Sequence, residues 1–247
     1  MKRIGLLLGT VALATVTLFN GASAATVLFK DTFKSFKLGK VWDAPAFLST
    51  NNVFHAYLGA PNVILAKTAN GLRMTSAEAN YQTTGIATVD AFSLTTGHVG
   101  IEFQTGDFID SSLTLPQGTT DKNIDGVIAL ELLNPTTGDY FVAELFGADY
   151  GTDTQFGVSS SLAPGTWYTG KTGWQYDESY QIVFDSTASA TVVKFEDSLG
   201  HVLFRHKLPA GLGYLGQFYI VLPQWMGTPG SSYVNDVFVH QVEAVQD

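Results

Sequence analysis

The sequence of 247 residues contains no cysteine. Disulfide bonds and thiolate metal sites are therefore excluded. The fold must be stabilised by its hydrophobic core or by a bound ion. A chain of this length is sufficient for one sizeable core, so a stable domain without disulfides is expected.

Positive charge is also scarce. Lys and Arg number 13 against 22 Asp and Glu, which gives a net charge of −9. Nucleic acids require a basic surface, and anionic membranes attract basic segments, so neither is an expected partner. Charged residues of both signs make up only 14% of the chain, against about 25% in an average soluble protein.

Long apolar runs are absent after residue 24, but one precedes it. The chain starts with Lys2 and Arg3, continues without a charge over residues 4–19, and then carries small residues up to Ala24. This is the layout of a signal peptide spanning residues 1–24, and it predicts export to the periplasm or the extracellular space. The alternative is a membrane anchor, but the run is shorter than the roughly 20 residues that a spanning helix needs. We therefore expect no membrane insertion of the mature chain.

Residues 25–247 are predicted to form a single all-β domain. Hydrophobic residues are 45% and aromatic residues 13% of the chain, and short apolar runs, many of them alternating with period two, are separated by turn residues, as in a sandwich or barrel. The expected strands include 26–29, 63–65, 72–75, 99–103, 126–133, 140–146, 180–184, 191–195, 201–204, 217–221 and 233–239.

Two hairpins can be placed in register. One joins 192–196 to 201–204 through Asp197 to Gly200. The other joins 126–133 to 140–146, and pairing Asn134 with Asp139 gives one wholly apolar face made of Ile128, Leu130, Leu132, Phe141, Ala143 and Leu145. Because register follows the buried face, we prefer this pairing to a slip of one residue.

Several segments carry a family resemblance. Residues 28–33 and Trp42 resemble the "DxF…LxxxxW" opening of laminarinase-type glycoside hydrolases and related jelly-roll domains. Residues 180–185, 218–229 and 233–239 are similar, in the same order, to later strands of that family. The resemblance implies a concanavalin A-like jelly-roll sandwich of two antiparallel sheets.

The catalytic motif of that family is degenerate in this chain. The family carries its carboxylates on one strand as E-x-D-x-(x)-E. The corresponding strand has Val127 and Ala129 at the first two positions, and only Glu131 matches the final glutamate. The hydrolytic mechanism of the family is therefore not implied.

A different carboxylate pair is the candidate for catalysis. In the preferred register Glu131 and Glu144 are diagonal neighbours on the face opposite the apolar one, roughly 7–8 Å apart. Flexible side chains could approach the ~5–5.5 Å separation of a retaining glycosidase pair. The alternative is two solvated glutamates on an exposed sheet face.

Aromatic residues in Gly- and Thr-rich segments are the candidates for ligand binding. Sugars present apolar faces that stack on such rings while polar side chains bind the hydroxyl groups. The alternative is packing beneath loops. The candidate residues are Trp167, Tyr168, Trp174, Tyr176 and Trp225.

Two sites are candidates for a structural calcium ion. Asp121, Asn123 and Asp125 followed by Gly126 have the D-x-N-x-D-G spacing of an oxygen-ligand loop, although Leu132 stands at the twelfth position, where an EF-hand needs glutamate. Separately, the family resemblance implies a calcium ligand at Asp236.

Three classes of function stay open at this point. The leading hypothesis is a glycan-binding protein acting on extracellular polysaccharide. The alternatives are a glycoside hydrolase or lyase with an unfamiliar carboxylate arrangement, and a structural or surface-interaction protein. An enzyme is the less favoured interpretation, because the family's nucleophile is missing.

The calcium hypothesis predicts a change in thermal stability. An ion that binds only the folded state stabilises it by about 2.7 kcal/mol at a hundredfold excess over the dissociation constant. Millimolar calcium should therefore raise the melting temperature by several degrees over chelator, at roughly 2–4 °C per kcal/mol. Asp125→Ala should abolish the shift if the loop binds the ion, and Asp236→Ala should do so if the strand does. Equal melting temperatures in calcium and chelator would contradict both sites.

Overall fold

The structure is a computed structural model, and it describes residues 25–34, 41–43, 63–79, 84–106, 126–134, 136–146, 155–162, 167–175, 177–208, 211, 215–222 and 232–247. Within these residues the chain forms strands and turns. The strands are β1 (Thr26–Asp31), β2 (Trp42–Asp43), β3 (Val63–Thr68), β4 (Gly71–Ala79), β5 (Thr84–Thr88), β6 (Phe92–Ser93), β7 (Gly97–Thr105), β8 (Gly126–Leu133), β9 (Tyr140–Phe146), β10 (Gln155–Ser160), β11 (Tyr168–Lys171), β12 (Ser179–Ser186), β13 (Thr191–Asp197), β14 (Val202–Leu208), β15 (Leu215–Leu222) and β16 (Ser232–Gln246). No helix in this part of the chain is long and apolar enough to cross a membrane.

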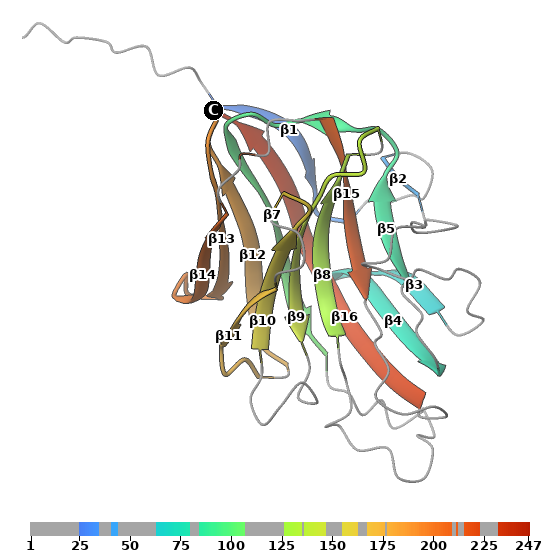
Figure 1. The fold of residues 1–247 in the computed structure, drawn as a ribbon. Helices are drawn as coiled ribbons and strands as arrows, with labels where there is room; N and C mark the ends of the chain where they lie inside the picture. Colours follow the sequence, from blue (N-terminus) through green and yellow to red (C-terminus); the bar gives the residue numbers. More distant parts are fainter. Residues whose placement is uncertain are drawn as a thin grey trace, which may run out of the picture.

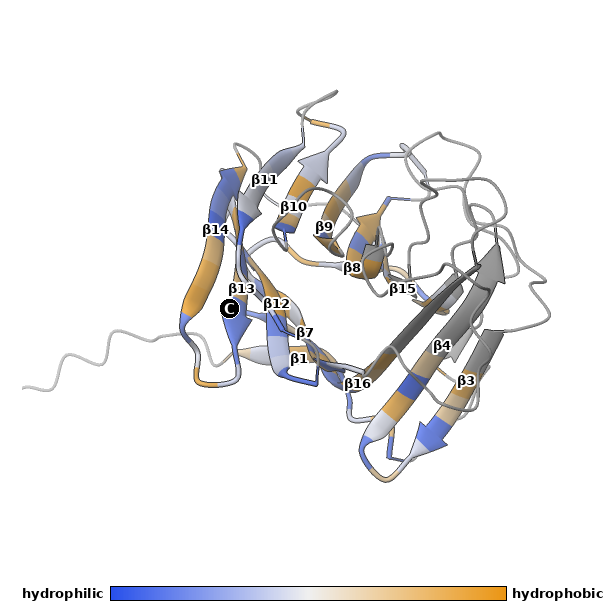
Figure 2. Cartoon of the chain, turned by 90° about the horizontal axis from the view of Figure 1, so that it is seen from below, coloured by the Kyte–Doolittle hydropathy of each residue, from blue (hydrophilic) through white to orange (hydrophobic). Residues whose placement is uncertain are grey.

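The strands form two antiparallel sheets that pack face to face (Figures 1 and 2). The first sheet has the order β14-β13-β12-β7-β16-β4-β3, with β1 also paired to β16. The second sheet has the order β11-β10-β9-β8-β15-β5-β2, with β6 also paired to β15. The prediction of an all-β jelly-roll sandwich of two antiparallel sheets is therefore confirmed.

Strand alternation builds the core between the two sheets. Along β12, for example, Tyr180, Ile182 and Phe184 are buried, and the residues between them are partly exposed. Aromatic stacking links the layers, since Phe156 of the second sheet stacks on Phe195 of the first with 4.8 Å between ring centroids. Within the first sheet, Tyr180 stacks on Phe195 with 5.0 Å between centroids. Such pairs stabilise a core beyond the area that they bury.

The predicted register of β8 and β9 is confirmed. The backbone N–H of Asn134 donates to the carbonyl of Asp139 at 2.8 Å, and Leu133 pairs with Tyr140. The Asn134 side chain accepts hydrogen bonds from the backbone N–H groups of Thr136 and Thr137, which fixes the turn. All six residues of the expected apolar face belong to the main core: Ile128, Leu130, Leu132, Phe141, Ala143 and Leu145.

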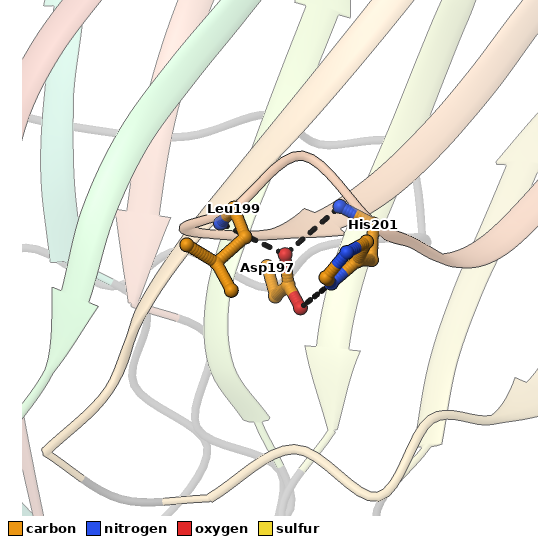
Figure 3. A network of polar contacts seen from close by, with 3 residues as sticks. All are labelled: Asp197, Leu199 and His201. Carbon is orange, nitrogen blue, oxygen red and sulfur yellow. Dashed lines mark hydrogen bonds and ion pairs between the residues drawn. The ribbon is translucent and has the colours of Figure 1, made fainter.

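The predicted hairpin between β13 and β14 is also present, and Asp197 organises its turn (Figure 3). One carboxylate oxygen of Asp197 accepts from the backbone N–H groups of Leu199 and His201, both at 2.9 Å, and the other lies 2.9 Å from Nδ1 of His201. These hydrogen bonds lower the pKa of Asp197, with the His201 backbone N–H contributing most. Gly200 completes the turn with a φ of 80°.

The strands β5, β10 and β11 were not expected from the sequence. Their segments contain Gly, Ser and Thr, which are turn residues in other contexts. In the fold they pair with longer strands, β5 with β15 and β10 with β9, so neighbouring strands determine their conformation.

The turn at Gly200 gives a stability prediction. A Cβ at this position would meet no other atom within 4 Å, so only the left-handed backbone conformation opposes a side chain there. Gly200→Ala should lower the free energy of unfolding by about 1–2 kcal/mol, the cost of placing an L-residue in that conformation. Gly200→Asn is the matched control, because Asn tolerates this region better. Thermal melts of the two variants give the comparison, and equal stability of Gly200→Ala and wild type would contradict the prediction.

Candidate functional site

The register of β8 and β9 places Glu131 and Glu144 together on the outer face of the second sheet. Glu131 lies opposite Val142, and Glu144 lies opposite Ala129, so the two carboxylates are diagonal neighbours, as predicted. Glu131 is 5% exposed and Glu144 is fully buried. The alternative interpretation, two solvated glutamates on an open face, is therefore wrong. We call this surface, defined by Glu131, Glu144, Phe146, Trp167 and Tyr219, the carboxylate face.

The surroundings of Glu131 are apolar. It pairs with Tyr219 of β15 on one side, and Ala87, Ala129 and Tyr219 form a small buried cluster with Leu133 on the same face. Burial raises the pKa of Glu131 from 4.5 to about 7, because the charged form loses its hydration. No hydrogen bond to this carboxyl group is found among the described residues. Glu131 therefore changes its charge close to neutral pH.

Tyr219 is an aromatic residue paired with Glu131, and the side chain of Gln217 on the same strand holds its hydroxyl in place. Its hydroxyl donates to the amide oxygen of Gln217 at 3.2 Å. The amide nitrogen of Gln217 donates in turn to the carbonyls of Thr88 and Val89, at 3.0 and 3.3 Å. Burial, and secondarily the charge of Glu131, raise the pKa of the Tyr219 phenol. The hydroxyl therefore stays protonated and available as a hydrogen-bond donor at neutral pH.

A pair of aromatic rings lies on the other side of Glu144. Glu144 pairs with Gly157 of β10, and a Cβ added to Gly157 would come within 2.6 Å of the Phe146 ring and 3.2 Å of the Trp167 ring. Both rings therefore lie over Gly157, on the same face as Glu144. Phe146 and Trp167 meet edge to face, with centroids 5.5 Å apart. Phe146 is buried, whereas Trp167 is 37% exposed and presents ring surface to solvent.

The other predicted aromatic residues do not join this group. Trp174 is buried in the core, where its indole N–H donates to the carbonyl of Phe146 at 2.9 Å, so the prediction that it binds ligand is wrong. Its position favours the alternative of structural packing, because no ring surface is available to a sugar. Tyr168 stacks on His206 of β14 at 4.0 Å and joins the edges of the two sheets. Tyr176 and Trp225 lie outside the described residues.

The predicted calcium ligands are not tested by the described side chains. Asp121, Asn123 and Asp125 lie outside the described residues. Asp236 lies on β16 with its backbone opposite Thr75, and its side chain is outside the described part. Among the described residues, no three His, Asp or Glu side chains are grouped to hold a metal ion. Calcium binding therefore stays a prediction.

Val127 and Ala129 are the β8 residues that the family resemblance put at the first two motif positions, and that correspondence stays a prediction. Ala129 lies on the face, two residues before Glu131 and directly opposite Glu144. Val127 lies at an irregularity in the register between Gly126 and Ile128, and it packs in the main core. In this chain the second carboxylate of the face comes from the neighbouring strand β9.

Sequence reasoning missed four residues at or beside the carboxylate face: Gln217, Tyr219, Phe146 and Gly157. Each becomes part of the face through strand pairing, of β15 with β8 and of β10 with β9. The one sequence signal for these residues was the Phe218–Leu222 segment, which carried the family resemblance. It indicates that a strand is present, but it does not indicate that this strand pairs with β8.

Comparisons with known proteins show the fold. No family model matches the sequence, and no curated protein matches it. Similar solved structures include a β-glucanase of Bacillus licheniformis, with 14% identity, a TM-score of 0.58, and coverage of 89% of this chain and 97% of that one. Lectin II from Ulex europaeus has 10% identity and a TM-score of 0.55, and the match covers 90% of this chain and 100% of the lectin. A non-specific endo-β-1,3(4)-glucanase from family GH16 has 12% identity and a TM-score of 0.57, with 91% and 92% covered. The chain therefore has the concanavalin A-like jelly-roll fold that the sequence resemblance implied.

The raised pKa of Glu131 predicts how stability depends on pH. The folded pKa of about 7 lies above the ordinary value of 4.5, so the folded state binds more protons than the unfolded state between these values. The free energy of unfolding should therefore decrease as pH rises from about 4.5 to 7, by up to about 3 kcal/mol from this group.

Glu131→Gln tests this dependence, because the amide cannot ionise. The variant should melt several degrees above wild type at pH 8 and show no such gain at pH 4. Glu178→Gln, at an exposed glutamate, is the matched control and should have little effect at either pH. Parallel pH profiles of Glu131→Gln and wild type would contradict the assignment.

Proposed function

We propose that the protein is a secreted glycan-binding protein that binds an extracellular polysaccharide on the carboxylate face. The observation that carries the proposal is the position of Trp167, a partly exposed ring fixed by Phe146 beside the buried carboxylates. A fixed ring offers a stacking surface with little loss of conformational entropy on binding. Glu131, which is 5% exposed, lies on the same face and can select the orientation of the hydroxyl groups.

Two further observations support this proposal. The chain has the fold of structures that include lectins and glycoside hydrolases. Its negative charge and shortage of basic residues do not suit polyanionic ligands such as nucleic acids. The signal-peptide pattern of residues 1–24 supports secretion, which would bring the protein to extracellular polysaccharides.

A second candidate function is glycoside hydrolysis by the pair Glu131 and Glu144. The specific observation in its favour is the pKa of Glu131 near 7, since a general acid has to be protonated near the working pH. Glu144 would then be the second carboxylate. The two functions differ in product, because hydrolysis releases new reducing ends and binding does not.

The test is a polysaccharide panel scored for both retention and released reducing ends. The panel contains mixed-linkage β-1,3(4)-glucan, galactan, mannan and mucin glycans. The binding hypothesis predicts retention without release for at least one of them. Release that is lost in Glu131→Gln and Glu144→Gln would support the hydrolase instead. A chain that shows neither retention nor release would contradict both functions and favour a structural or surface-interaction role.

Trp167→Ala should weaken retention roughly tenfold, the size of effect expected for a well-placed aromatic anchor. Trp167→Phe should recover part of the loss, because it restores an aromatic surface. Leu199→Ala is the matched control, since Leu199 is 79% exposed but lies in the turn between β13 and β14, away from the face. Unchanged retention in Trp167→Ala would contradict the assignment of the site.

A further inference from the structure

The outer face of the first sheet has a regular grid of side chains around Gly100. Strand pairing aligns Gln181, Glu102 and Gln241 in one row across β12, β7 and β16. The next row is Val183, Gly100 and Glu243, and Asp185 and His98 are paired beyond it. The residues between them along β7, Val99, Ile101 and Phe103, are buried in the core, so the grid faces outward.

Gly100 leaves a depression at the centre of this grid. Its neighbours are larger side chains, and they form the rim of a hollow of about 290 Å³. A second hollow of about 330 Å³ adjoins the first, shares Glu102 and Gln241 with it, and extends to Asn70 in the β3–β4 turn. We call the two hollows together the Gly100 groove. Its length therefore spans β12, β7, β16 and the turn after β3.

Ion pairs hold the rim of the groove in place. Nζ of Lys30 lies 2.8 Å from Glu243, and Nε2 of His98 lies 3.5 Å from the same carboxylate. Lys194 pairs with Asp185 on the other side. Interaction with Lys30 lowers the pKa of Glu243, so its carboxylate is ionised at neutral pH. The rim is therefore organised without a ligand.

The row that joins the two hollows has unused hydrogen-bonding capacity. Among the described residues, no hydrogen bond or ion pair is found for the side chains of Gln181, Glu102 and Gln241. Together these side chains offer two amide NH₂ groups as donors, and two amide oxygens and one carboxylate as acceptors, within one row. Val183 and Gly100 add a small apolar floor beside them.

We propose that the Gly100 groove is a second glycan-binding site, which takes two adjacent sugar residues of a neutral polysaccharide through Gln181, Glu102 and Gln241. Sugar hydroxyls both donate and accept hydrogen bonds, so they match a row of amides around a carboxylate. Glu102, for which no ion pair is found among the described residues, would repel an acidic glycan, whereas Asp185 and Glu243 are already paired with Lys194 and Lys30. The groove shares no residue with the carboxylate face. This proposal therefore rests on the proposed function only for its class of ligand, a polysaccharide.

An extended peptide is a poorer match for the groove. The groove lies across the middle of a sheet, whose strands are already paired on both sides, so it offers no edge for an added strand. It also lacks a deep apolar pocket for an anchoring side chain, which peptide sites commonly use.

Two sites on opposite faces of the sandwich would make the protein bivalent. A single chain could then join two polysaccharide strands or bind one polymer with increased avidity. The two sites should contribute separately to retention, because the core lies between them.

The test uses the full chain carrying Trp167→Ala, in which the first site is weakened. Side-chain amide resonances of Gln181 and Gln241 and the backbone amide of Gly100 are followed by NMR during titration with mixed-linkage β-glucan, galactan and mannan tetrasaccharides. We expect at least one tetrasaccharide to shift these resonances in the Trp167→Ala protein as it does in wild type. A lysine-rich peptide is titrated in parallel.

Glu102→Ala and Gln241→Ala should each weaken this binding roughly tenfold, as expected for the loss of a hydrogen bond to or from the ligand. Lys207→Ala is the matched control, because Lys207 is exposed on β14 of the same sheet but lies outside the groove. Groove resonances that stay unmoved with every tetrasaccharide, or that respond to the peptide alone, would overturn the proposal. Retention in wild type with unmoved groove resonances would leave the carboxylate face as a binding site and remove only the groove.

Discussion

The register between β8 and β9 is the constraint on which the candidate site depends. The Asn134 turn fixes it, and six apolar side chains are buried as a result. Because side chains alternate along a strand, the same register places Glu131 and Glu144 on the opposite face. A shift of one residue would bring Glu144 into the core and disperse the carboxylate face. The hydrophobic core and the carboxylate pair are therefore set by one pairing.

The burial of Glu131 links stability to possible chemistry. Apolar neighbours and Tyr219 surround the carboxyl group, so its ionisation is opposed and its pKa lies near 7. Above this pH the folded state carries a buried charge, which lowers its stability. The same environment supplies a carboxyl group that is partly protonated at neutral pH and able to donate a hydrogen bond. Ala129 is a small residue on this face, directly opposite Glu144.

Period-two patterns and turn residues were sufficient to predict much of the fold. Strands β8 and β9 were predicted with the bounds that the structure has, because their alternation and the Asn134–Asp139 turn agree. Strands β5, β10 and β11 were missed, because their residues acquire strand conformation only by pairing with neighbours. For the site, the pattern predicted that Glu131 and Glu144 share a face. It did not predict their burial, because burial depends on what packs over a face.

Trp167 and Trp174 also show that the sequence pattern does not predict which side chains are buried. Trp167 and Trp174 lie seven residues apart in similar Gly- and Thr-rich sequence. Trp167 packs edge to face against Phe146, lies over Gly157, and keeps part of its ring exposed. Trp174 is buried in the core, and its indole N–H donates to the Phe146 carbonyl. Phe146 therefore positions both rings, one through its side chain and one through its backbone. A glycine at position 157 is the condition for this arrangement, since any larger residue would displace the rings that form the exposed edge of the carboxylate face.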